Sequence, residues 1–270
     1  MIDLHIHSVF SDGHWTPEEI IADAQKKKLT DIAITDHDAI QGYQEAKKLA
    51  PSNLNLISGI ELNTDGVYGE LHILGYNFDP EHPSMLGHIS WRSQERKDWG
   101  KKIVDRLNEL GYTISFDKCL DRVGKGVLVR THIAEELAAA GYFPNWKEAH
   151  QALLKKGKPG FVERSPFSAV NAIDLIHEAG GEAFLAHPGI YTKPFSLEEL
   201  VVAGLDGIEV WHPKHSSADV EYWEKQAERF GMTVSGGSDF HGPVSRNPFP
   251  IGSVEIPEWA ETAVKKLVTN

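Results

Sequence analysis

The feature of this 270-residue chain that most constrains its fold is a repeated alternation of short β-rich runs with helical runs. Runs such as MIDLHIH and TDIAITDHD are each followed by a segment with helical periodicity, and the pattern recurs towards the end of the chain. Repeated β-then-α units predict a parallel sheet connected by helices, either open or closed into a barrel. Because many units follow one another without a glycine-rich dinucleotide-binding motif, the pattern favours an α/β barrel.

One long segment interrupts this alternation. Residues 88–165 have mostly helical periodicity, including the amphipathic stretch WRSQERKDWGKKIVDRLNELGY, and the β-then-α units resume after them. A segment that interrupts a repeating pattern is better explained as an insertion than as a separate domain. We therefore expect residues 1–87 and 166–270 to form the barrel, and residues 88–165 to form a helical insertion that covers the substrate.

Composition excludes several classes of partner. A formal charge of −12 argues against a broad surface for duplex DNA or anionic lipid. The sequence has no apolar run of membrane-spanning length and no signal-peptide pattern at its start. Its single cysteine, Cys119, allows no intramolecular disulfide and suits a reducing compartment. We expect a cytoplasmic protein without a membrane or duplex-DNA partner, and nothing in the sequence indicates an obligate protein partner.

Polar side chains stand where the predicted strands end. His5 and His7 are two apart in the first strand, so their side chains point to the same face. Later strands lead into further histidines and carboxylates, namely Asp36, His37, Asp38, Glu61, His72, His187, Asp239 and His241. Burying these groups without partners would cost free energy, whereas shared metal ions would satisfy them together. Imidazole and carboxylate ligands suit zinc, manganese or iron, so the sequence predicts a multinuclear metal site.

The ordered motifs HIHS, SDG, ITDHD, GIE, HILGY, LAHPG and GSDFH resemble the polymerase and histidinol phosphatase (PHP) superfamily of metal-dependent phosphoesterases. The segments VRTHIAEEL and KPGFV are similar to the branch that dephosphorylates nucleoside 3′,5′-bisphosphates, some members of which trim short RNA from its 5′ end. The resemblance implies a distorted (β/α)7 TIM-like barrel with a helical insertion. It also implies two or three divalent metal ions, usually manganese, zinc or iron.

The same resemblance implies a set of metal ligands. The first metal would be held by His5, His7, Glu61 and Asp239. Glu61 would bridge to the second metal, whose other ligands would be His72 and His187. The third metal would be held by Asp12, His37 and His241. We expect Asp36 and Asp38 to orient histidines rather than to bind metal.

The implied reaction is removal of the 3′-phosphate from a nucleoside 3′,5′-bisphosphate, or trimming of short RNA, by a hydroxide that bridges two metal ions. His212 in EVWHP is a candidate acid for the leaving group, with a surface histidine as the alternative interpretation. Arg130, at the start of a predicted helix, and Lys158 are candidates for binding the second phosphate. The expected partner is thus a small phosphorylated substrate.

Three other functions compete with this interpretation. A histidinol-phosphate phosphatase or other small phosphomonoesterase would use the same metals, but it has no second phosphate for Arg130 to bind. An amidohydrolase also begins with HxH in a barrel, but its metals are often bridged by a modified lysine, and here the candidate is Glu61. A metal-stabilised structural PHP module is the non-enzyme alternative, and the complete set of ligands argues against it.

Overall fold

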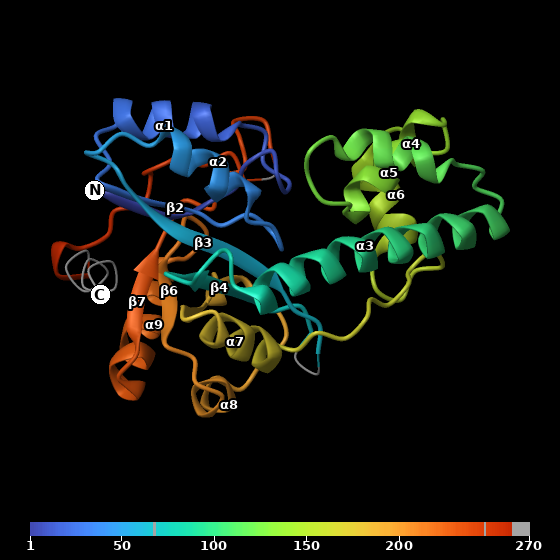
Figure 1. Cartoon of the computed structure of the whole chain (residues 1–270). Coiled ribbons are helices and arrows are strands. Elements are labelled where there is room, and N and C mark those ends of the chain that lie inside the picture. The colour runs from blue at the N-terminus through green and yellow to red at the C-terminus, as the bar shows by residue number, and fades with distance from the viewer. Residues whose placement is uncertain (67–68, 246, 261–270) are drawn as a thin grey trace. The chain divides into compact units, whose positions relative to one another are not determined.

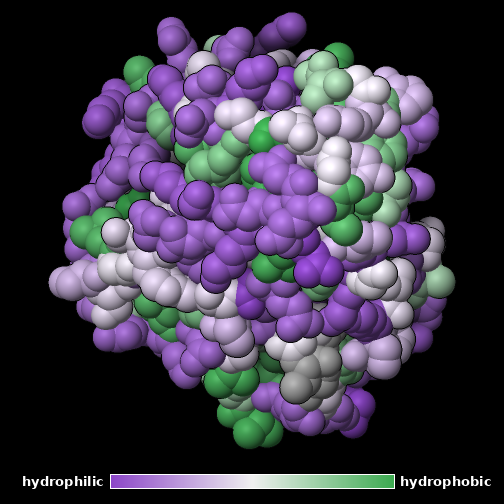
Figure 2. Space-filling view, turned by 90° about the vertical axis from the view of Figure 1, so that its right-hand side faces the viewer, coloured by the Kyte–Doolittle hydropathy of each residue, from purple (hydrophilic) through white to green (hydrophobic). Residues whose placement is uncertain are grey.

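The computed structural model describes residues 1–66, 69–245 and 247–260 (Figure 1). The chain divides into two compact units, Met1–Gly87 with Pro166–Asn270, and His88–Ser165. Hydrophilic side chains dominate the face shown in Figure 2. Within the described ranges, no helix combines the length and the apolar character needed to cross a bilayer.

The first unit is built on a seven-stranded sheet in which the strands follow one another in chain order. The described strands are β1 (Ile2–Ile6), β2 (Asp31–Ile34), β3 (Asn55–Asn63), β4 (His72–Tyr76), β5 (Glu182–Leu185), β6 (Gly207–Trp211) and β7 (Thr233–Gly236). A parallel bridge joins Ile6 to Phe240, and the His7 N–H donates to the Phe240 carbonyl at 2.8 Å. These contacts bring the two edges of the sheet together, so the predicted distorted α/β barrel is confirmed.

One strand runs against the others. β4 is antiparallel to both β3 and β5, whereas the other neighbouring strands are parallel. The described residues between β3 and β4 form no helix, and so short a connection cannot carry the chain back for parallel pairing. The register pairs His72, the first residue of β4, with Asn63, the last residue of β3. A strand start is therefore placed at the rim where the other strands end.

Helices cover the outside of the sheet, and most of them connect neighbouring parallel strands (Figure 1). They are α1 (Pro17–Lys26), α2 (Gln41–Leu49), α7 (Ala169–Glu178), α8 (Leu197–Val202), α9 (Ser217–Phe230) and the short 3₁₀ turn η2 (Pro188–Ile190). A capping box begins α1: the Thr16 hydroxyl accepts from the Glu19 N–H, and the Glu19 carboxylate accepts from the Thr16 N–H. The segment EWAETAVKKLVTN, whose periodicity predicts a last helix, lies mostly outside the described residues.

The second unit is helical and packs around a core of its own. It comprises most of α3 (Pro83–Glu109), α4 (Phe116–Val123), α5 (Arg130–Ala139), α6 (Trp146–Ala149) and the π-helical turn η1 (His150–Leu154). Buried side chains from these helices form one cluster that includes Trp99, Leu107, Ile133, Leu137 and Leu153. Cys119 lies in the same cluster, where burial raises the pKa of its thiol to about 12. That this unit covers a substrate stays a prediction.

Close backbone packing holds the first and last strands together at the rim. A Cβ atom on Gly237, which directly follows β7, would lie 2.4 Å from both the Cβ and the backbone nitrogen of His5. Only glycine fits such an approach, because any side chain would collide with the β1 backbone. The residues after β7 are thus held directly against the first histidine of the chain.

Candidate metal centre

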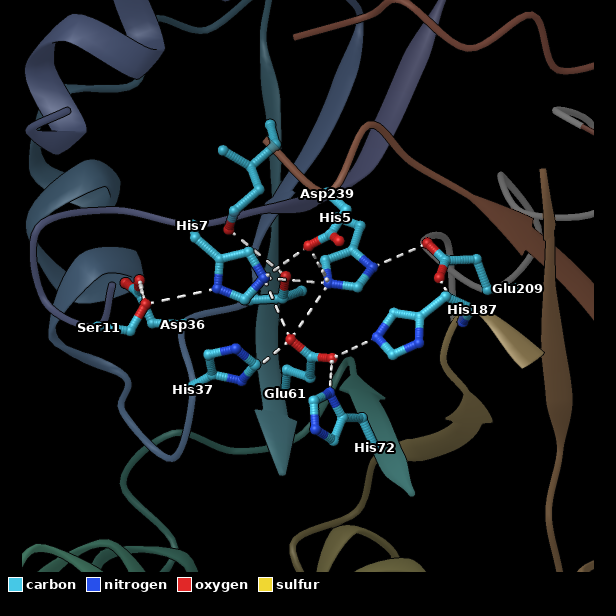
Figure 3. A network of polar contacts seen from close by, with 12 residues as sticks. His5, His7, Ser11, Asp36, His37, Glu61, His72, His187, Glu209 and Asp239 are labelled. Carbon is cyan, nitrogen blue, oxygen red and sulfur yellow. Dashed lines mark hydrogen bonds and ion pairs between the residues drawn. The ribbon is translucent and has the colours of Figure 1, made fainter. Parts of the chain in front are cut away.

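The predicted ligands all belong to the first unit and come from one rim of its barrel (Figure 3). His5 and His7 lie in or just after β1, and Glu61 lies in β3. The other ligands follow the ends of β1, β2, β5 and β7, except His72, which the antiparallel direction of β4 places at this rim. Polar side chains that the sequence distributes over more than 230 positions thus meet at one place.

Glu61 occupies the centre of this cluster, and its two carboxylate oxygens face different histidines (Figure 3). Oε2 lies 3.1 Å from His7 Nε2, 3.1 Å from His37 Nδ1 and 3.3 Å from His5 Nε2. Oε1 lies 2.7 Å from His72 Nδ1 and 3.0 Å from His187 Nε2. The side chain is buried, with 1% of its surface exposed. A carboxylate divided in this way is arranged to bridge two cations.

The spacing of ligand atoms on the Oε2 side fits a single metal ion. His5 Nε2, His7 Nε2, Glu61 Oε2 and Asp239 Oδ1 lie between 3.1 and 3.4 Å from one another in the recorded pairs. Four tetrahedral ligands of a zinc ion, each about 2.0–2.2 Å from it, are about 3.3–3.6 Å apart. Two carboxylates and two imidazoles that converge on one point form a set of donor atoms that can hold a single cation. This set matches the one that the resemblance implies for the first metal.

Two further groups of ligand atoms surround the first. Asp12 Oδ1 lies 3.2 Å from His241 Nε2, 3.7 Å from His37 Nε2 and 3.8 Å from His7 Nδ1, so His7 borders this group as well. His37 also forms a group with Glu61 and His72. His187 belongs to none of the three groups found among the described residues, although its Nε2 contacts Glu61. The structure thus brings all the predicted ligands together, with His37 between two groups.

Electrostatics at the centre favour charged carboxylates. Burial alone would raise the pKa of Glu61, but the neighbouring histidines, His37 foremost, hold it well below its usual value. Asp239 is also buried, and His5 and His241 hold the pKa of its carboxyl well below the usual range. The carboxylates are therefore ionised at neutral pH, the form in which they bind cations.

The direction of the pKa shift divides the histidines of the centre into two classes. Burial opposes the protonation of His5, but three surrounding carboxylates, of which Glu209 has the largest effect, raise the pKa of its imidazole well above the usual value. Burial also opposes the protonation of His7, yet hydrogen bonds to Asp239 and Glu61 raise its pKa to about 9. In contrast, burial lowers the pKa values of His37 and His187. Without a cation, the carboxylates thus keep protons on two of the histidines.

We expect the apparent affinity for Mn²⁺ to rise with pH, and the contribution of His7 to this rise to end above about pH 9, its pKa. Below that pH, His7 carries a proton that a metal ion must displace, because only neutral imidazole is a ligand. For each proton displaced, the apparent Mn²⁺ affinity rises by up to about tenfold per pH unit. Calorimetric titration in buffers of different ionisation enthalpy measures the protons released. A His177→Ala variant, which removes a histidine paired with Asp206, should release as many as the unaltered chain, and a pH-independent affinity would contradict the expectation.

Asp36 fixes the loop that carries Asp12. Its carboxylate accepts from the Ser8 N–H at 2.7 Å and from the Ser8 and Ser11 hydroxyls at 2.6 Å each. Asp36 is expected to orient a histidine, and it acts through Ser11, whose hydroxyl oxygen lies 3.4 Å from His7 Nδ1. Asp36 thus holds the backbone just after His7. Asp38 accepts from the backbone N–H of Asn63 at 3.2 Å and so ties two neighbouring strand ends together.

His212 lies inside the cluster rather than on the surface. It is 4% exposed, and its Nε2 lies 3.3 Å from Asp239 Oδ2. Its Nδ1 accepts from the backbone N–H of Lys214 at 3.2 Å, so in the neutral ring Nε2 carries the proton and faces Asp239. The surface interpretation is therefore excluded, and the role of His212 as an acid stays a prediction.

The sequence interpretation missed two residues that contact the ligands. Glu209, in β6, accepts from His5 and from the backbone of His187. Asn247 donates through Nδ2 to Asp239, and its Oδ1 accepts from Lys214. Glu209 had a signal, namely a carboxylate within the apolar run GIEVW. Asn247 had none, because it lies among the polar residues and prolines of a loop.

Arg130 and Lys158 belong to the second unit. Arg130 is the first residue of α5, and its guanidinium carbon lies 5.1 Å from the ring centroids of both Trp99 and Phe161. Such stacking holds a guanidinium in a fixed orientation. Lys158 is exposed in the turn after η1. Their roles in substrate binding stay predictions.

A barrel that gathers histidines and carboxylates at the rim where its strands end is the architecture of a metal-dependent hydrolase. The chain belongs to the PHP family, because the PHP domain model matches residues 3–208. It is a metal-dependent phosphoesterase of that family, and its buried histidine and carboxylate clusters are suited to hold the metal ions.

Known proteins resemble the chain over most of its length. It is 32% identical to the 3′,5′-nucleoside bisphosphate phosphatase of Chromobacterium violaceum, over 90% of this chain and 87% of the relative. It is 32% identical to the 5′-3′ exoribonuclease Rnm of Salmonella typhimurium, over 89% and 85%. The phosphoribosyl 1,2-cyclic phosphate 1,2-diphosphodiesterase of Eggerthella lenta is also 32% identical, over 91% and 96%. A solved structure of a candidate metal-dependent phosphoesterase from Bifidobacterium adolescentis superposes with a TM-score of 0.85 at 28% identity, covering 99% of this chain and 95% of that one.

Proposed function

We propose that this protein removes the 3′-phosphate from nucleoside 3′,5′-bisphosphates, and that short RNA is a second substrate of the same site. The observation that carries the proposal is the divided contact of Glu61, whose oxygens face separate sets of histidines. Centres with two or more metal ions are suited to phosphoryl transfer, because the ions act on both the attacking and the leaving oxygen. The names of the bisphosphate phosphatase and the exoribonuclease support the choice of substrate. The name of the third relative, a cyclic-phosphate diesterase, favours a cyclic phosphate as the alternative substrate.

The proposed ligand sets are those that the family resemblance implies, and the close spacing of His5, His7, Glu61 and Asp239 supports the first of them. His5, His7, Glu61 and Asp239 would hold one ion, Glu61 with His72 and His187 a second, and Asp12 with His37 and His241 a third. Manganese, zinc and iron all suit these donors. When bound, such ions lower the pKa of water to about 7 and offset the charge of the phosphate.

The protein's own residues would then orient the substrate and move a proton. The leaving ribose oxygen needs a proton as its bond to phosphorus breaks, and His212 Nε2–H is a buried donor beside Asp239. In the second unit, the stacked guanidinium of Arg130 would bind the 5′-phosphate through two parallel hydrogen bonds. Lys158 would add a positive charge from the exposed turn.

The proposal is tested by measuring phosphate release by the manganese-loaded protein from adenosine 3′,5′-bisphosphate. The comparison substrates are 3′-AMP, 5′-AMP, histidinol phosphate and a ribose 1,2-cyclic phosphate. We expect strong preference for the bisphosphate, with 5′-AMP as the product. Preferred turnover of histidinol phosphate or of the cyclic phosphate would keep the metal centre and overturn the substrate assignment.

We expect Arg130→Ala to lower kcat/KM for adenosine 3′,5′-bisphosphate by about 10- to 100-fold, the value of charge-assisted hydrogen bonds to one phosphate. Turnover of 3′-AMP, which lacks the 5′-phosphate, should change little, so the preference itself is lost. Arg130→Lys keeps the positive charge but lacks the planar guanidinium, so it should retain only part of the preference for the bisphosphate. Arg229→Ala, which removes an exposed arginine paired with Glu198, is the control. Equal losses on both substrates would contradict the role.

A further inference from the structure

Glu209 is a fully buried carboxylate that belongs to none of the ligand sets. It lies in β6, where the pairing with β7 shifts register between Glu209 and Trp211. Such an irregularity re-aims a side chain relative to a regular strand. Figure 3 shows the carboxylate beyond His5 and His187, on the side away from Glu61. A charge with no solvent exposure needs strong compensating contacts.

One carboxylate oxygen of Glu209 fixes the ring of His5. Oε1 lies 2.8 Å from His5 Nδ1, and because a carboxylate only accepts, Nδ1 carries the hydrogen. In the neutral ring, Nε2 is then the free lone pair, and it faces Glu61 and Asp239 at 3.3 and 3.4 Å. A hydrogen bond of this kind sets both the tautomer and the rotation of a ligating imidazole.

The other oxygen fixes the backbone of His187. Oε2 accepts from the His187 N–H at 2.7 Å. His187 has left-handed backbone angles, φ 31° and ψ 53°, which are rare for a residue other than glycine. Strained conformations of this kind persist only where surrounding contacts hold them. From this conformation, His187 Nε2 reaches Glu61 Oε1 at 3.0 Å.

We infer that Glu209 is a positioning residue that couples the metal positions on the two sides of Glu61. Its Oε1 orients a histidine facing Glu61 Oε2, and its Oε2 orients a histidine facing Glu61 Oε1. One rigid carboxylate therefore sets the geometry of both positions, and a change in it alters both together. The inference rests on the metal centre of the proposed function.

The decisive variant is Glu209→Gln, which keeps the shape of the side chain but offers only one accepting oxygen. Its NH₂ group would face either the His5 Nδ1–H or the His187 N–H. One hydrogen bond would then be lost, because two N–H donors would face each other. We expect the affinities for the Mn²⁺ ions on both sides of Glu61 to fall by about 10- to 100-fold. Calorimetric titration with Mn²⁺ measures the affinities, and the visible spectrum of the Co²⁺-loaded protein reports the ligand geometry. His187→Ala should weaken chiefly one ion.

Two controls separate positioning from general stability. Glu136→Gln alters another buried glutamate, paired with Arg122 in the second unit, and should leave Mn²⁺ affinity and the Co²⁺ spectrum unchanged. In the unaltered protein, ¹⁵N NMR of the histidines should show His5 protonated at Nδ1 with metal bound, and this measurement needs no variant. Ligation by His5 through Nδ1 would overturn the inference even if Glu209→Gln fails to fold.

The outcomes also distinguish the inference from the proposed function. If the unaltered protein binds neither Mn²⁺ nor Co²⁺, the metal centre itself is wrong. If it binds both, while Glu209→Gln has the same affinities and the same Co²⁺ spectrum, the metal centre stands and the coupling through Glu209 is refuted. Loss of affinity on one side only would refute the coupling and leave Glu209 as the partner of a single histidine.

Discussion

Replacing Glu61 with glutamine should lower phosphate release by ~10³-fold or more, because an amide cannot provide two anionic oxygens to cations on opposite sides. Oε2 contacts His5, His7 and His37, and Oε1 contacts His72 and His187. Loss of the bridging charge thus affects both sides at once. Phosphate release from adenosine 3′,5′-bisphosphate and the metal content of the purified protein are the measurements.

A matched control for this variant is Glu182→Gln. Glu182 begins β5, so it lies at the end of its strand opposite His187, and it is only partly buried. It should retain full metal content and turnover. Circular dichroism of both variants should match that of the unaltered chain, since Glu61→Gln keeps the volume of the side chain. Full activity of Glu61→Gln would refute the bridging role and the ligand assignment built on it.

The barrel could be predicted because each of its β-then-α units can be recognised from a short stretch of sequence. Each short apolar run followed by a capped helix, such as the Thr16–Glu19 box before α1, indicates one β-then-α unit. The reversed direction of β4 was not predicted from periodicity, since apolar alternation is the same in either direction. The information lay in the connection between β3 and β4, which is too short for a parallel return.

The cluster of histidines and carboxylates could be predicted because these residues break the rule that barrel interiors are apolar. His5, His7 and His187 each follow aliphatic residues in strands that are otherwise buried. Residues that act through the ligands are harder to find. Glu209 breaks the same rule, but its position within β6 gives no sign that it faces His5. That contact joins residues 204 positions apart and depends on the register shift between β6 and β7.

The net charge of the chain shows a similar limit of sequence reasoning. A formal charge of −12 argues against binding nucleic acid over a broad surface, yet the proposed substrates are anions. The carboxylates at the centre, Glu61, Asp239 and Asp12, contribute to this negative charge, and bound cations would reverse its local sign. The total charge therefore predicts little about a ligand that meets the protein only at its metal ions.

Removing divalent ions with a chelator should lower the melting temperature of the chain substantially. An ion present at about 100 times its dissociation constant stabilises the folded state by about 2.7 kcal/mol, since the unfolded chain has no preformed site. For a unit of roughly 200 residues, this corresponds to about 5–10 °C for each ion.

The stabilisation by metal ions should require the intact metal centre, and it should be confined to the unit that contains this centre. Differential scanning calorimetry with and without Mn²⁺ measures it, and Glu61→Gln should show a much smaller shift than the unaltered chain. The helical unit His88–Ser165 has a core of its own and none of the ligand groups. If it melts separately, its transition should not move with Mn²⁺. Equal melting temperatures with Mn²⁺ and with chelator, in the unaltered chain, would mean that the clustered histidines and carboxylates hold no metal ion in the folded protein.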